Sequence, residues 1–533
     1  MYDYNCPDCN EAKLQSDKNA RKINEVIDQV NALIQVNNET VDFIEEKANE
    51  IIGEVAGREV NEVLGDLRTE LDNTHSSLDN IENKNSWYVN IKSYLPENET
   101  DISNALLLAV ESLNADGGTI ILPCDITYTI SSPVTITKNN VVIKSNSQYY
   151  NTTINVTSDV GINVLAYGFE CEGIRFIGNG NEEGGIDATN IAIQVGDGIY
   201  ENYDNFLFKK SQCYKFGKGL KINTRNFIIE NSTFTWCLIG VEVEGLIFAG
   251  AVQGDRRNYR IADNRFHVCW GTALKLTGQV AHSEVIITNN QFDRCMDNIT
   301  GYCEESLISN NLITVARGKG IYIDNTNILC GHLGTTVINN IITSWVGVEE
   351  NSGDGIYLKA ENSVIRGNKI SRKNGYGICV IGNNNEITSN NVTDSSYFNS
   401  GEYSGIYIKG NFTLINNNIS KNVKGTTQKY GLEITSDSQG CVMNGNLLNG
   451  SKGLTSELPP STQGITYEGM TRSLRFGSGI PNNKEGQRGD YVINKIPTEM
   501  GETGSHYIIH GWQKVQDYTG GTSWVEVRTL TGR

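Results

Sequence analysis

The chain has 533 residues, with 55 glycines, only 8 prolines and a formal net charge of −18. A chain of this length can bury a large core in more than one domain. The acidic balance argues against nucleic acid as a partner, because phosphate binding needs clustered Lys and Arg. No apolar run approaches a membrane span or follows a basic start as in a signal peptide, so we expect folding in the cytoplasm and no membrane insertion.

Residues 1–16 contain Cys6-Pro7-Asp8-Cys9, a single CxxC pair among the 12 cysteines of the chain. A zinc site needs four ligands, so one pair is a weak signal. A plain attachment peptide, and metal or disulfide chemistry where copies of the chain meet, both stay open. The cysteines do not indicate a disulfide framework in a chain this long. Four of them recur once per repeat and predict a buried ladder of thiols: Cys213, Cys237, Cys269 and Cys295.

Residues 17–86 carry apolar side chains at spacings of three and four, the pattern of a coiled coil. β-Branched residues at both seam positions favour more than two strands, and Asn37 in the seam can fix the register. A phase shift near Gly53 and Gly57 is a stutter, which locally unwinds the supercoil. The alternative is an amphipathic helix packed on a globular domain. Because the seam is long, we predict a trimerisation stalk and therefore a homotrimer.

Residues 87–455 contain a degenerate repeat that predicts a parallel β-helix, so we expect a mainly β protein. The segment opens with an expected helix at residues 101–114 and a strand at residues 118–123, which would cap the open end of the solenoid. Apolar strands that begin at a glycine then alternate with apolar–asparagine units. In a β-helix such strands stack about 4.8 Å apart and leave one long sheet face as a groove. The clearest of these strands begin at Gly320, Gly355, Gly377, Gly405 and Gly431.

The last segment, residues 456–533, begins with a linker that contains Pro459 and Pro460. Short β-segments follow, with Trp512 and Trp524 among them. This pattern predicts a small separate β module, which would serve trimerisation or receptor binding.

Both ends of the chain body resemble known proteins. Residues 90–145 contain Asp101-Ile102-Ser103-Asn104-Ala105, Gly117-Gly118-Thr119-Ile120-Ile121-Leu122-Pro123 and Ile130-Ser131-Ser132-Pro133-Val134-Thr135-Ile136. This opening resembles that of the pectate-lyase-like right-handed β-helix superfamily found in bacteriophage tailspikes. Pro96-Glu97-Asn98-Glu99-Thr100 replaces the usual Gly-Asp-Gly before the helix. The ending, residues 488–532, resembles C-terminal modules of tail proteins from phages of Gram-positive hosts.

The resemblance implies a homotrimeric virion protein that binds, and often cuts, a host surface polymer. That polymer would be a capsular or wall polysaccharide or a teichoic acid. Residues 1–16 would attach to phage tail, baseplate or collar proteins, and residues 87–455 would bind the receptor and depolymerise it. Such a protein is made in the host cytoplasm and acts from the virion tail at the host cell surface.

The outward residues of the repeat predict where the chemistry lies. In Gly240-Val241-Glu242-Val243-Glu244 the valines point inward and both glutamates outward. The Cα atoms of Glu242 and Glu244 lie about 6.8 Å apart, which allows the carboxyl separations that glycosidases use. Like charges so close push one pKa upward, as a general acid requires. We predict that this pair catalyses acid/base hydrolysis. The alternative is a solvated face on which Glu and Lys pair.

Asp324 is a secondary catalytic candidate. It ends an outward strand roughly three rungs, or about 14 Å, from Glu244, too far to be its direct partner. It would serve a separate subsite, or a site with Asp297 and Asp354. Catalytic carboxylates could also lie between subunits of a trimer.

Eight residues are predicted to bind the polymer. Lysines on adjacent rungs flank the two glutamates, two arginines lie in the excursion that follows them, and tyrosines and a further lysine line later rungs. Sugar hydroxyls would take hydrogen bonds here, and sugar rings would stack on tyrosine. These residues are Lys221, Arg256, Arg257, Lys275, Tyr322, Tyr357, Lys359 and Tyr407.

Two other functions fit the same pattern. A non-catalytic adhesin would use the carboxylates only as hydrogen-bond acceptors. A polysaccharide lyase needs a basic residue near a uronate and often calcium, in which case Lys275 or Lys359 would act. For hydrolysis we expect no cofactor and no metal site, with a divalent cation as the alternative.

Overall fold

The structure is a computed structural model of the chain, which divides into two compact units, residues 1–83 and 84–533. The predicted attachment peptide and all of the predicted stalk except Arg68 lie outside the described residues and stay predictions. No helix in the described part of the chain is long and apolar enough to cross a membrane. The structure describes residues 68, 87–147, 151–181, 187–197, 203–245, 256–326, 334–344, 353–456, 458–459, 474–482, 490–515 and 523–531.

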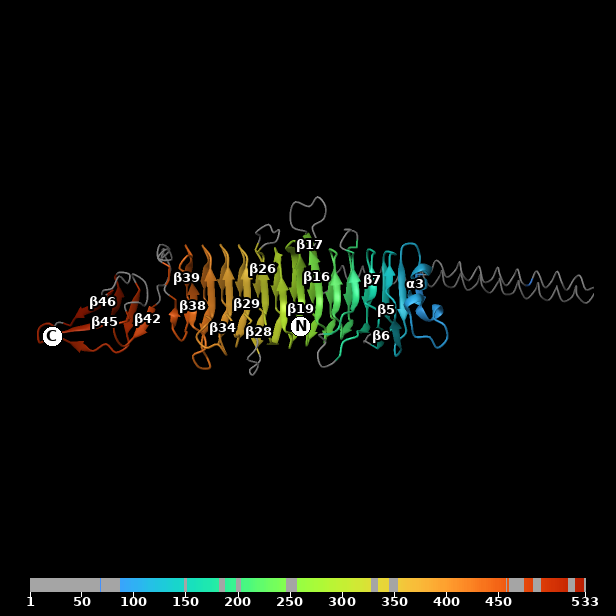
Figure 1. Cartoon of the computed structure of the whole chain (residues 1–533). Coiled ribbons are helices and arrows are strands. Elements are labelled where there is room, and N and C mark those ends of the chain that lie inside the picture. Colours follow the sequence, from blue (N-terminus) through green and yellow to red (C-terminus); the bar gives the residue numbers. More distant parts are fainter. Residues whose placement is uncertain are drawn as a thin grey trace, which may run out of the picture. The chain divides into compact units, whose positions relative to one another are not determined.

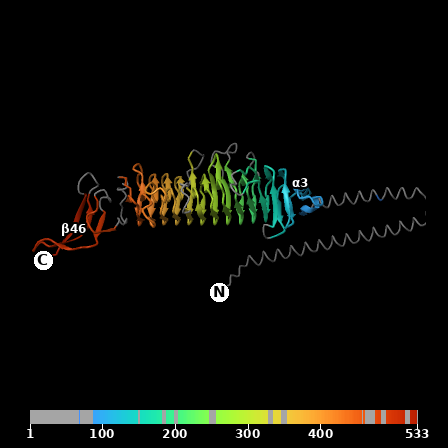
Figure 2. The same ribbon diagram turned by 60° about the horizontal axis from the view of Figure 1, so that its bottom comes forward.

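Residues 88–455 wind into a parallel β-helix, which confirms the predicted fold (Figure 1). Each turn of the chain, here called a rung, gives one strand in succession to each of three sheets. Equivalent strands of consecutive rungs pair in parallel, as β13 (Lys218–Ile222) does with β16 (Ile239–Gly245). The strands follow the order of the sequence from the cyan end of the stack to the orange end in both ribbon views (Figures 1 and 2).

Sheet 1 is the first sheet that the chain enters in each rung. Among the described residues it has 15 strands, and one of them, β23, pairs with β20 outside the main strand order. They are β1 (Tyr88–Asn90), β2 (Gly118–Leu122), β5 (Val141–Ser145), β8 (Glu170–Glu172), β11 (Leu207–Lys209), β14 (Ile228–Glu230), β17 (Arg256–Ala262), β20 (His282–Thr288), β23 (Cys303–Glu304), β24 (Leu307–Ser309), β27 (Thr336–Ile338), β30 (Val364–Arg366), β33 (Glu386–Thr388), β36 (Leu414–Asn416) and β39 (Val442–Asn444).

Sheet 2 follows sheet 1 in each rung and has 13 strands in the described part of the chain. They are β3 (Thr127–Ile130), β6 (Thr152–Val156), β9 (Ile174–Ile177), β12 (Gln212–Tyr214), β15 (Thr233–Thr235), β18 (Arg265–His267), β21 (Gln291–Asp293), β25 (Leu312–Ala316), β28 (Ile341–Ser344), β31 (Lys369–Ser371), β34 (Asn391–Thr393), β37 (Ile419–Lys421) and β40 (Leu447–Leu448).

Sheet 3 completes each rung and carries the predicted groove residues. It has 13 strands within the described ranges. They are β4 (Val134–Ile136), β7 (Val160–Val164), β10 (Ile191–Val195), β13, β16, β19 (Thr272–Gly278), β22 (Asp297–Gly301), β26 (Ile321–Asp324), β29 (Ile356–Lys359), β32 (Ile378–Ile381), β35 (Ile406–Lys409), β38 (Tyr430–Ile434) and β41 (Gly453–Thr455).

A helical cap closes the first end of the β-helix, as predicted. The 3₁₀ turn η1 (Ile91–Tyr94) and the helix α3 (Ser103–Ser112) precede the first full rung. The Asp101 carboxylate accepts the backbone N–H of Ser103 at 3.0 Å and so satisfies one of the free donors at the helix start. The helix buries Leu106 and Ala109 in the core, which covers the apolar end of the stack.

The interior is filled by side chains that stack from rung to rung. The rings of Phe234, Phe266 and Phe292 on sheet 2 lie parallel, with centroids 5.0 and 4.8 Å apart. Cys237, Cys269 and Cys295 are buried free thiols one rung apart, as predicted. Cys213 is buried too, but it pairs in register with Phe234 and therefore occupies the phenylalanine row. The sequence alignment missed this shift because Cys213 has no phenylalanine three residues before it.

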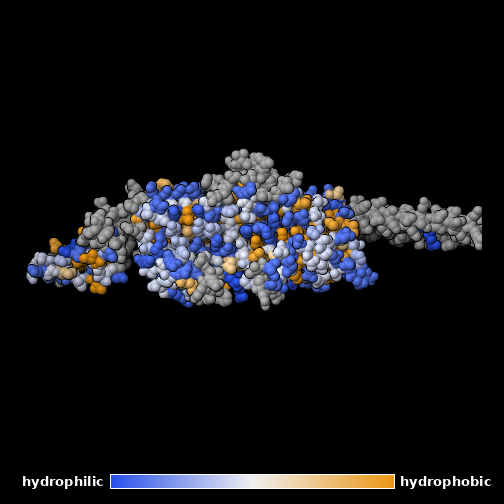
Figure 3. Space-filling model, viewed as in Figure 1, coloured by the Kyte–Doolittle hydropathy of each residue, from blue (hydrophilic) through white to orange (hydrophobic). Residues whose placement is uncertain are grey.

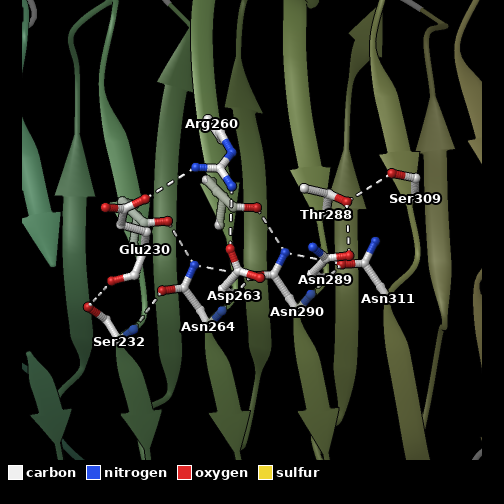
Figure 4. A network of polar contacts seen from close by, with 12 residues as sticks. Glu230, Ser232, Arg260, Asp263, Asn264, Thr288, Asn289, Asn290, Ser309 and Asn311 are labelled. Atoms are coloured by element: carbon white, nitrogen blue, oxygen red, sulfur yellow. Dashed lines mark hydrogen bonds and ion pairs between the residues drawn. The ribbon is translucent and has the colours of Figure 1, made fainter. Parts of the chain in front are cut away.

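A ladder of buried asparagines runs along the turn between sheets 1 and 2 (Figure 4). In each step, one asparagine uses its side-chain Oδ1 to accept both the backbone N–H and the side-chain N–H of the asparagine one rung before. Asn390, for example, accepts from Asn368 at 3.0 Å twice, and it donates to the Ile365 carbonyl and to Asn418 at 2.9 Å each. The ladder therefore satisfies buried backbone donors at every turn. Its buried members are Asn264, Asn290, Asn311, Asn340, Asn368, Asn390 and Asn418, and it ends at Asn446, which is only partly buried.

The C-terminal segment forms a separate mixed sheet. Among the described residues its strands are β42 (Leu474–Gly477), β43 (Tyr491–Asn494), β44 (Glu499–Met500), β45 (Tyr507–Lys514) and β46 (Trp524–Leu530). Val492, Ile509, Trp512 and Trp524 form a small core of their own. The predicted tryptophans are thus core residues, and the role of this module stays a prediction.

Replacing a ladder asparagine should destabilise the fold far more than replacing its outward neighbour. Asn390→Ala leaves several buried polar partners without a hydrogen bond, at a cost of about 2–4 kcal/mol in the free energy of unfolding. Asn391→Ala is the matched control, because Asn391 points outward from sheet 2 on the adjacent position. Thermal and urea unfolding of the two variants checks this, and equal losses would contradict the role of the ladder.

Candidate functional site

The outer side of sheet 3 carries a continuous row of polar and aromatic side chains, here called the central row. The register of the sheet places these residues one rung apart, with the alternation that the sequence predicts. Val241, Ile323 and Leu358, which are next to row residues along their own strands, are fully buried. The row reads Gln194, Lys221, Glu242, Lys275, Thr300, Tyr322, Tyr357, Cys379, Tyr407 and Glu433.

Glu242 lies beneath lysines rather than in open solvent. Only 5% of the residue is exposed. Its carboxylate pairs with the Lys218 ammonium and accepts from Lys275 Nζ at 3.2 Å. Burial acts to raise the pKa of Glu242, but the two ammonium groups outweigh it and lower the pKa overall. A general acid needs a raised pKa, so this environment favours a permanently ionised carboxylate.

Glu244 is held by a different set of partners. Its Oε2 lies 3.8 Å from Lys221 Nζ, and the side-chain amide of Asn223, turned to donate, reaches the same oxygen at 3.2 Å. The structure thus brings Lys221 and Lys275 to the two glutamates, as the sequence predicts. Lys218 was missed, because it stands at the very start of β13, where the inward–outward alternation gives no clear side.

Arg256 and Arg257 belong to a different sheet from the glutamates. They begin β17, which is a strand of sheet 1, where Arg256 pairs with Ser283. Their side chains, and residues 246–255 before them, lie outside the described part of the structure. Their predicted contact with an anionic polymer therefore stays a prediction.

Tyr322 and Tyr357 stack on each other with ring centroids 4.4 Å apart. Lys319 Nζ lies 3.9 Å from the centroid of Tyr322, and at that distance it must cover the opposite ring face. Both faces of Tyr322 are therefore occupied, and its edge and hydroxyl are what can meet a ligand. Tyr407 is separated from Tyr357 by Cys379 and packs instead on Tyr376, with centroids 4.7 Å apart.

Asp324 and Lys359 meet next to the stacked tyrosines. The Asp324 carboxylate lies 3.9 Å from Lys359 Nζ and 3.5 Å from the Tyr322 hydroxyl, and it accepts the backbone N–H of Thr326 at 3.0 Å. Its strand β26 is three strands from β16 in sheet 3. The structure therefore keeps Asp324 apart from Glu242 and Glu244, as the sequence predicts.

A second row, here called the edge row, runs beside the central row and consists of Asp297, Lys319, Asp354 and Tyr376. Lys319, Asp354 and Tyr376 each precede the glycine before a sheet 3 strand, whereas Asp297 begins β22. Backbone hydrogen bonds join their rungs. Burial raises the pKa of Asp354 to about 6. The hydrogen bond from the Tyr376 backbone N–H and the positive charges of Lys373 and Lys319 oppose this shift. The sequence named Asp297 and Asp354 only as companions of Asp324, and it gave no sign of the burial that raises this pKa.

Lys373 is a fully buried lysine beside the edge row. Its ammonium donates to the Gly318 carbonyl at 2.6 Å. Burial lowers the pKa of Lys373 to about 8, and the neighbouring Asp354 and Asp297 oppose this shift. Lys373 follows a sheet 2 strand in a turn, a position that did not indicate burial from the sequence.

Within the described residues, no group of three or more His, Cys, Asp or Glu side chains is arranged to hold a metal ion. The paired carboxylates of the two rows lie instead beside lysines. A divalent cation stays the alternative to the expected absence of a cofactor.

Comparisons with known proteins agree with the fold. A family model described as "Right handed beta helix region" matches residues 304–476. No curated protein matches the sequence. The catalytic unit of a thermostable GH87 α-1,3-glucanase from Streptomyces thermodiastaticus has a TM-score of 0.50 and 14% identity over 71% of this chain and 70% of that chain.

Two further solved structures illustrate the spread of similar folds. The Dettilon tailspike protein has a TM-score of 0.47 and 10% identity over 80% of this chain and 77% of that chain. The A-module of the mannuronan C-5 epimerase AlgE6 from Azotobacter vinelandii has a TM-score of 0.44 and 14% identity over 70% of this chain and 100% of that chain. At such identities the likeness concerns the fold alone.

Replacing Asp354 should change stability in a pH-dependent way. A carboxyl whose pKa is raised from 3.8 to about 6 on folding costs almost nothing below pH 3.8; its cost to stability grows as the pH rises from 3.8 to 6 and is complete above 6. Asp354→Asn keeps an oxygen to accept the Tyr376 N–H and removes the buried charge. We expect the variant to gain stability relative to the parent, by up to about 3 kcal/mol at pH 7.5 and by little at pH 4.

Thermal unfolding of both proteins across this pH range measures the difference. A difference in stability that does not depend on pH would contradict a buried, raised-pKa carboxyl at this position.

Proposed function

We propose that the protein binds an extended glycan along the outer side of sheet 3 and cleaves it by hydrolysis. The observation that carries this proposal is the unbroken central row, which presents an ammonium, a carboxylate or a hydroxyl group at every rung from Lys221 to Tyr357. Groups spaced about 4.8 Å apart suit a polymer that offers hydroxyls at regular intervals. The view in Figure 3 shows a β-helix surface that is largely hydrophilic, with hydrophobic patches between polar residues.

The glutamate–lysine cluster supports binding more directly than proton donation. Glu242 is ionised and ion-paired, so its carboxylate and the ammonium groups of Lys218 and Lys275 form a fixed cluster of charges to which sugar hydroxyls can hydrogen-bond. Lys221 with Glu244 and Lys359 with Asp324 extend the same pattern. The lowered pKa of Glu242 fits an ionised base but not the proton-donating acid that the predicted pair also needs.

The finer proposal is a tailspike of a phage of a Gram-positive host. The sequence resemblance at residues 90–145 and 488–532 supports it, together with the trimeric seam predicted for residues 17–86. The polymer would then be a capsular or wall polysaccharide or a teichoic acid at the host cell surface. A receptor-binding adhesin and a polysaccharide lyase are the alternatives.

The outer side of sheet 1 supports the proposed homotrimer. Ile228 and Ile286 are outward residues on this sheet, and 39% and 38% of their surface is exposed. They share a row with Leu207, Arg260 and Leu307, in register along the stack, and Arg260 stands between the two isoleucines. A largely apolar row parallel to the stack suits side-by-side contact between identical subunits, because each copy presents the same row at the same height.

Cleavage is tested by incubating the full chain with purified capsular polysaccharide, wall polysaccharide and teichoic acid from Gram-positive bacteria. We expect one polymer to lose molar mass and to release reducing ends, measured by light scattering and end-group assay. Binding without loss of mass would support the adhesin, and an unsaturated product that absorbs in the ultraviolet would support the lyase. If no polymer binds and none loses molar mass, the proposal is contradicted.

A matched variant tests whether the tyrosines bind through their hydroxyls. Tyr322→Phe combined with Tyr357→Phe keeps the ring stack and removes two hydroxyl groups. Loss of two hydrogen bonds should weaken binding to that polymer about tenfold while the unfolding temperature stays unchanged. Unchanged affinity would assign the contact to other groups.

The trimer is tested by light scattering of the full chain, which should give three times the chain mass of 58.8 kDa. Ile228→Lys combined with Ile286→Lys should leave the trimer intact through the stalk but lower its unfolding temperature by several degrees. The control is Ile341→Lys on sheet 2, because Ile341 is 42% exposed. A monomeric mass, or equal unfolding temperatures for the two variants, would contradict the proposed contact.

A further inference from the structure

Asp297 and Asp354 stand in the same row on the outer side of sheet 3, two rungs apart, with Lys319 on the rung between them. The backbone N–H of Asn298 donates to the Lys319 carbonyl at 3.1 Å, and that of Gly320 donates to the Asp354 carbonyl at 3.0 Å. Two rung spacings put the Cα atoms of the aspartates roughly 9.5 Å apart. Carboxyl groups held parallel in one row keep a similar separation, near the upper end of the range for inverting glycosidases.

Both aspartates are fixed by the same local construction. Asp297 Oδ1 accepts the backbone N–H of Lys319 at 2.9 Å, and Asp354 Oδ1 accepts that of Tyr376 at 2.8 Å. A glycine precedes each donor residue, and a Cβ there would lie 2.5 Å from Asp297 Oδ1 at Gly318 and 2.3 Å from Asp354 Oδ1 at Gly375. One oxygen of each carboxyl is thus tied to the next rung, which fixes the orientation of the group.

Lys373 places a buried positive charge beside both carboxyls. Its ammonium reaches the Gly318 carbonyl two rungs before it, next to the donor of Asp297, and it interacts electrostatically with both Asp297 and Asp354. Lys319 turns away from the row, with its ammonium over the Tyr322 ring. The carboxyl of Asp354 is held partly protonated near neutral pH, because burial raises its pKa to about 6.

We propose that Asp354 and Asp297 are the acid and the base of an inverting glycoside hydrolysis on the edge row. This inference rests on the proposed function and names its catalytic residues. The substrate is a glycan whose scissile bond lies above the rung of Lys319, between the two carboxyls.

The reaction balances with water as the second substrate. Asp354 donates its proton to the glycosidic oxygen as the bond from that oxygen to the anomeric carbon breaks. Asp297 takes a proton from a water molecule as the water oxygen bonds to the anomeric carbon from the opposite side. The products are a free hydroxyl on the leaving sugar and a new reducing end of inverted configuration. Proton exchange with solvent then restores both carboxyls.

The catalytic candidates Glu242 and Asp324 fit this chemistry less well. Glu242 is paired with Lys218 and Lys275, which lower its pKa and remove the proton that an acid must give. Asp324 stands at the far end of its strand, roughly five residues or 16 Å along the chain from the edge row. The edge row therefore combines a carboxyl of raised pKa with a second carboxyl at a suitable distance.

The experiment uses the full chain and the polymer that it degrades in the cleavage assay. Asp354→Asn and Asp297→Asn should each lower the rate of reducing-end release roughly 10²–10⁴-fold, with binding to the intact polymer retained. The matched control is Asp394→Asn on the turn after β34. Asp394 Oδ1 also ties the next rung, through the backbone N–H groups of Val423 at 2.6 Å and Lys424 at 2.9 Å. This control should keep the parental rate.

Proton NMR of the first product should show the anomer opposite to the linkage that was cut. Retained configuration, or a parental rate in Asp354→Asn, would overturn the assignment while leaving the proposed function in place. Loss of cleavage in Glu242→Gln and Glu244→Gln but in neither aspartate variant would move the reaction to the central row. If the parent cleaves no polymer, the proposed hydrolysis and this inference fall together.

Discussion

The parallel register between rungs is the constraint on which the rest of the structure depends. Parallel pairing puts equivalent residues of successive rungs about 4.8 Å apart, so one residue type at one position of the repeat becomes a row along the stack. The buried asparagine ladder holds this register at the turn between sheets 1 and 2, since each amide satisfies backbone donors of the preceding rung. A slip of one residue would exchange the inward and outward sides and destroy every row at once.

The same register determines which ionisable groups become neighbours on sheet 3. Glu242 is flanked by lysines one rung before and one rung after, so its charge is neutralised by neighbours that the stacking supplies. Asp354 lies next to backbone and aromatic groups, and burial there outweighs the nearby lysines. Two carboxyl groups on the same sheet therefore acquire opposite pKa shifts. This difference separates residues that can bind a glycan as fixed charges from one that can transfer a proton.

Much of this arrangement could be predicted from the sequence. The glycine-led strands, the capping helix and the inward position of Val241, Ile323 and Leu358 follow from period-two alternation and turn chemistry. The neighbours Lys221, Glu242 and Lys275 follow from alignment of the repeats. Side-chain partners across rungs were harder to predict. The burial of Glu242 depends on Lys218, and the stacking of Tyr322 between Lys319 and Tyr357 depends on rotamers that a repeat pattern does not specify.

The edge row shows the limit of the sequence most clearly. Loops of different length separate the strands that carry Asp297, Lys319 and Asp354, so the spacing of these residues in the sequence does not reveal that they share a row. Lys373 lies beside them but comes from another turn of the chain. The most direct test of the account is a crystal structure of the Asp354→Asn variant with an oligosaccharide from its polymer bound. The account predicts a sugar chain on the outer side of sheet 3, with a glycosidic oxygen beside residue 354 and a water molecule beside Asp297. A sugar chain bound on sheet 1 or sheet 2, with the edge row empty, would contradict it.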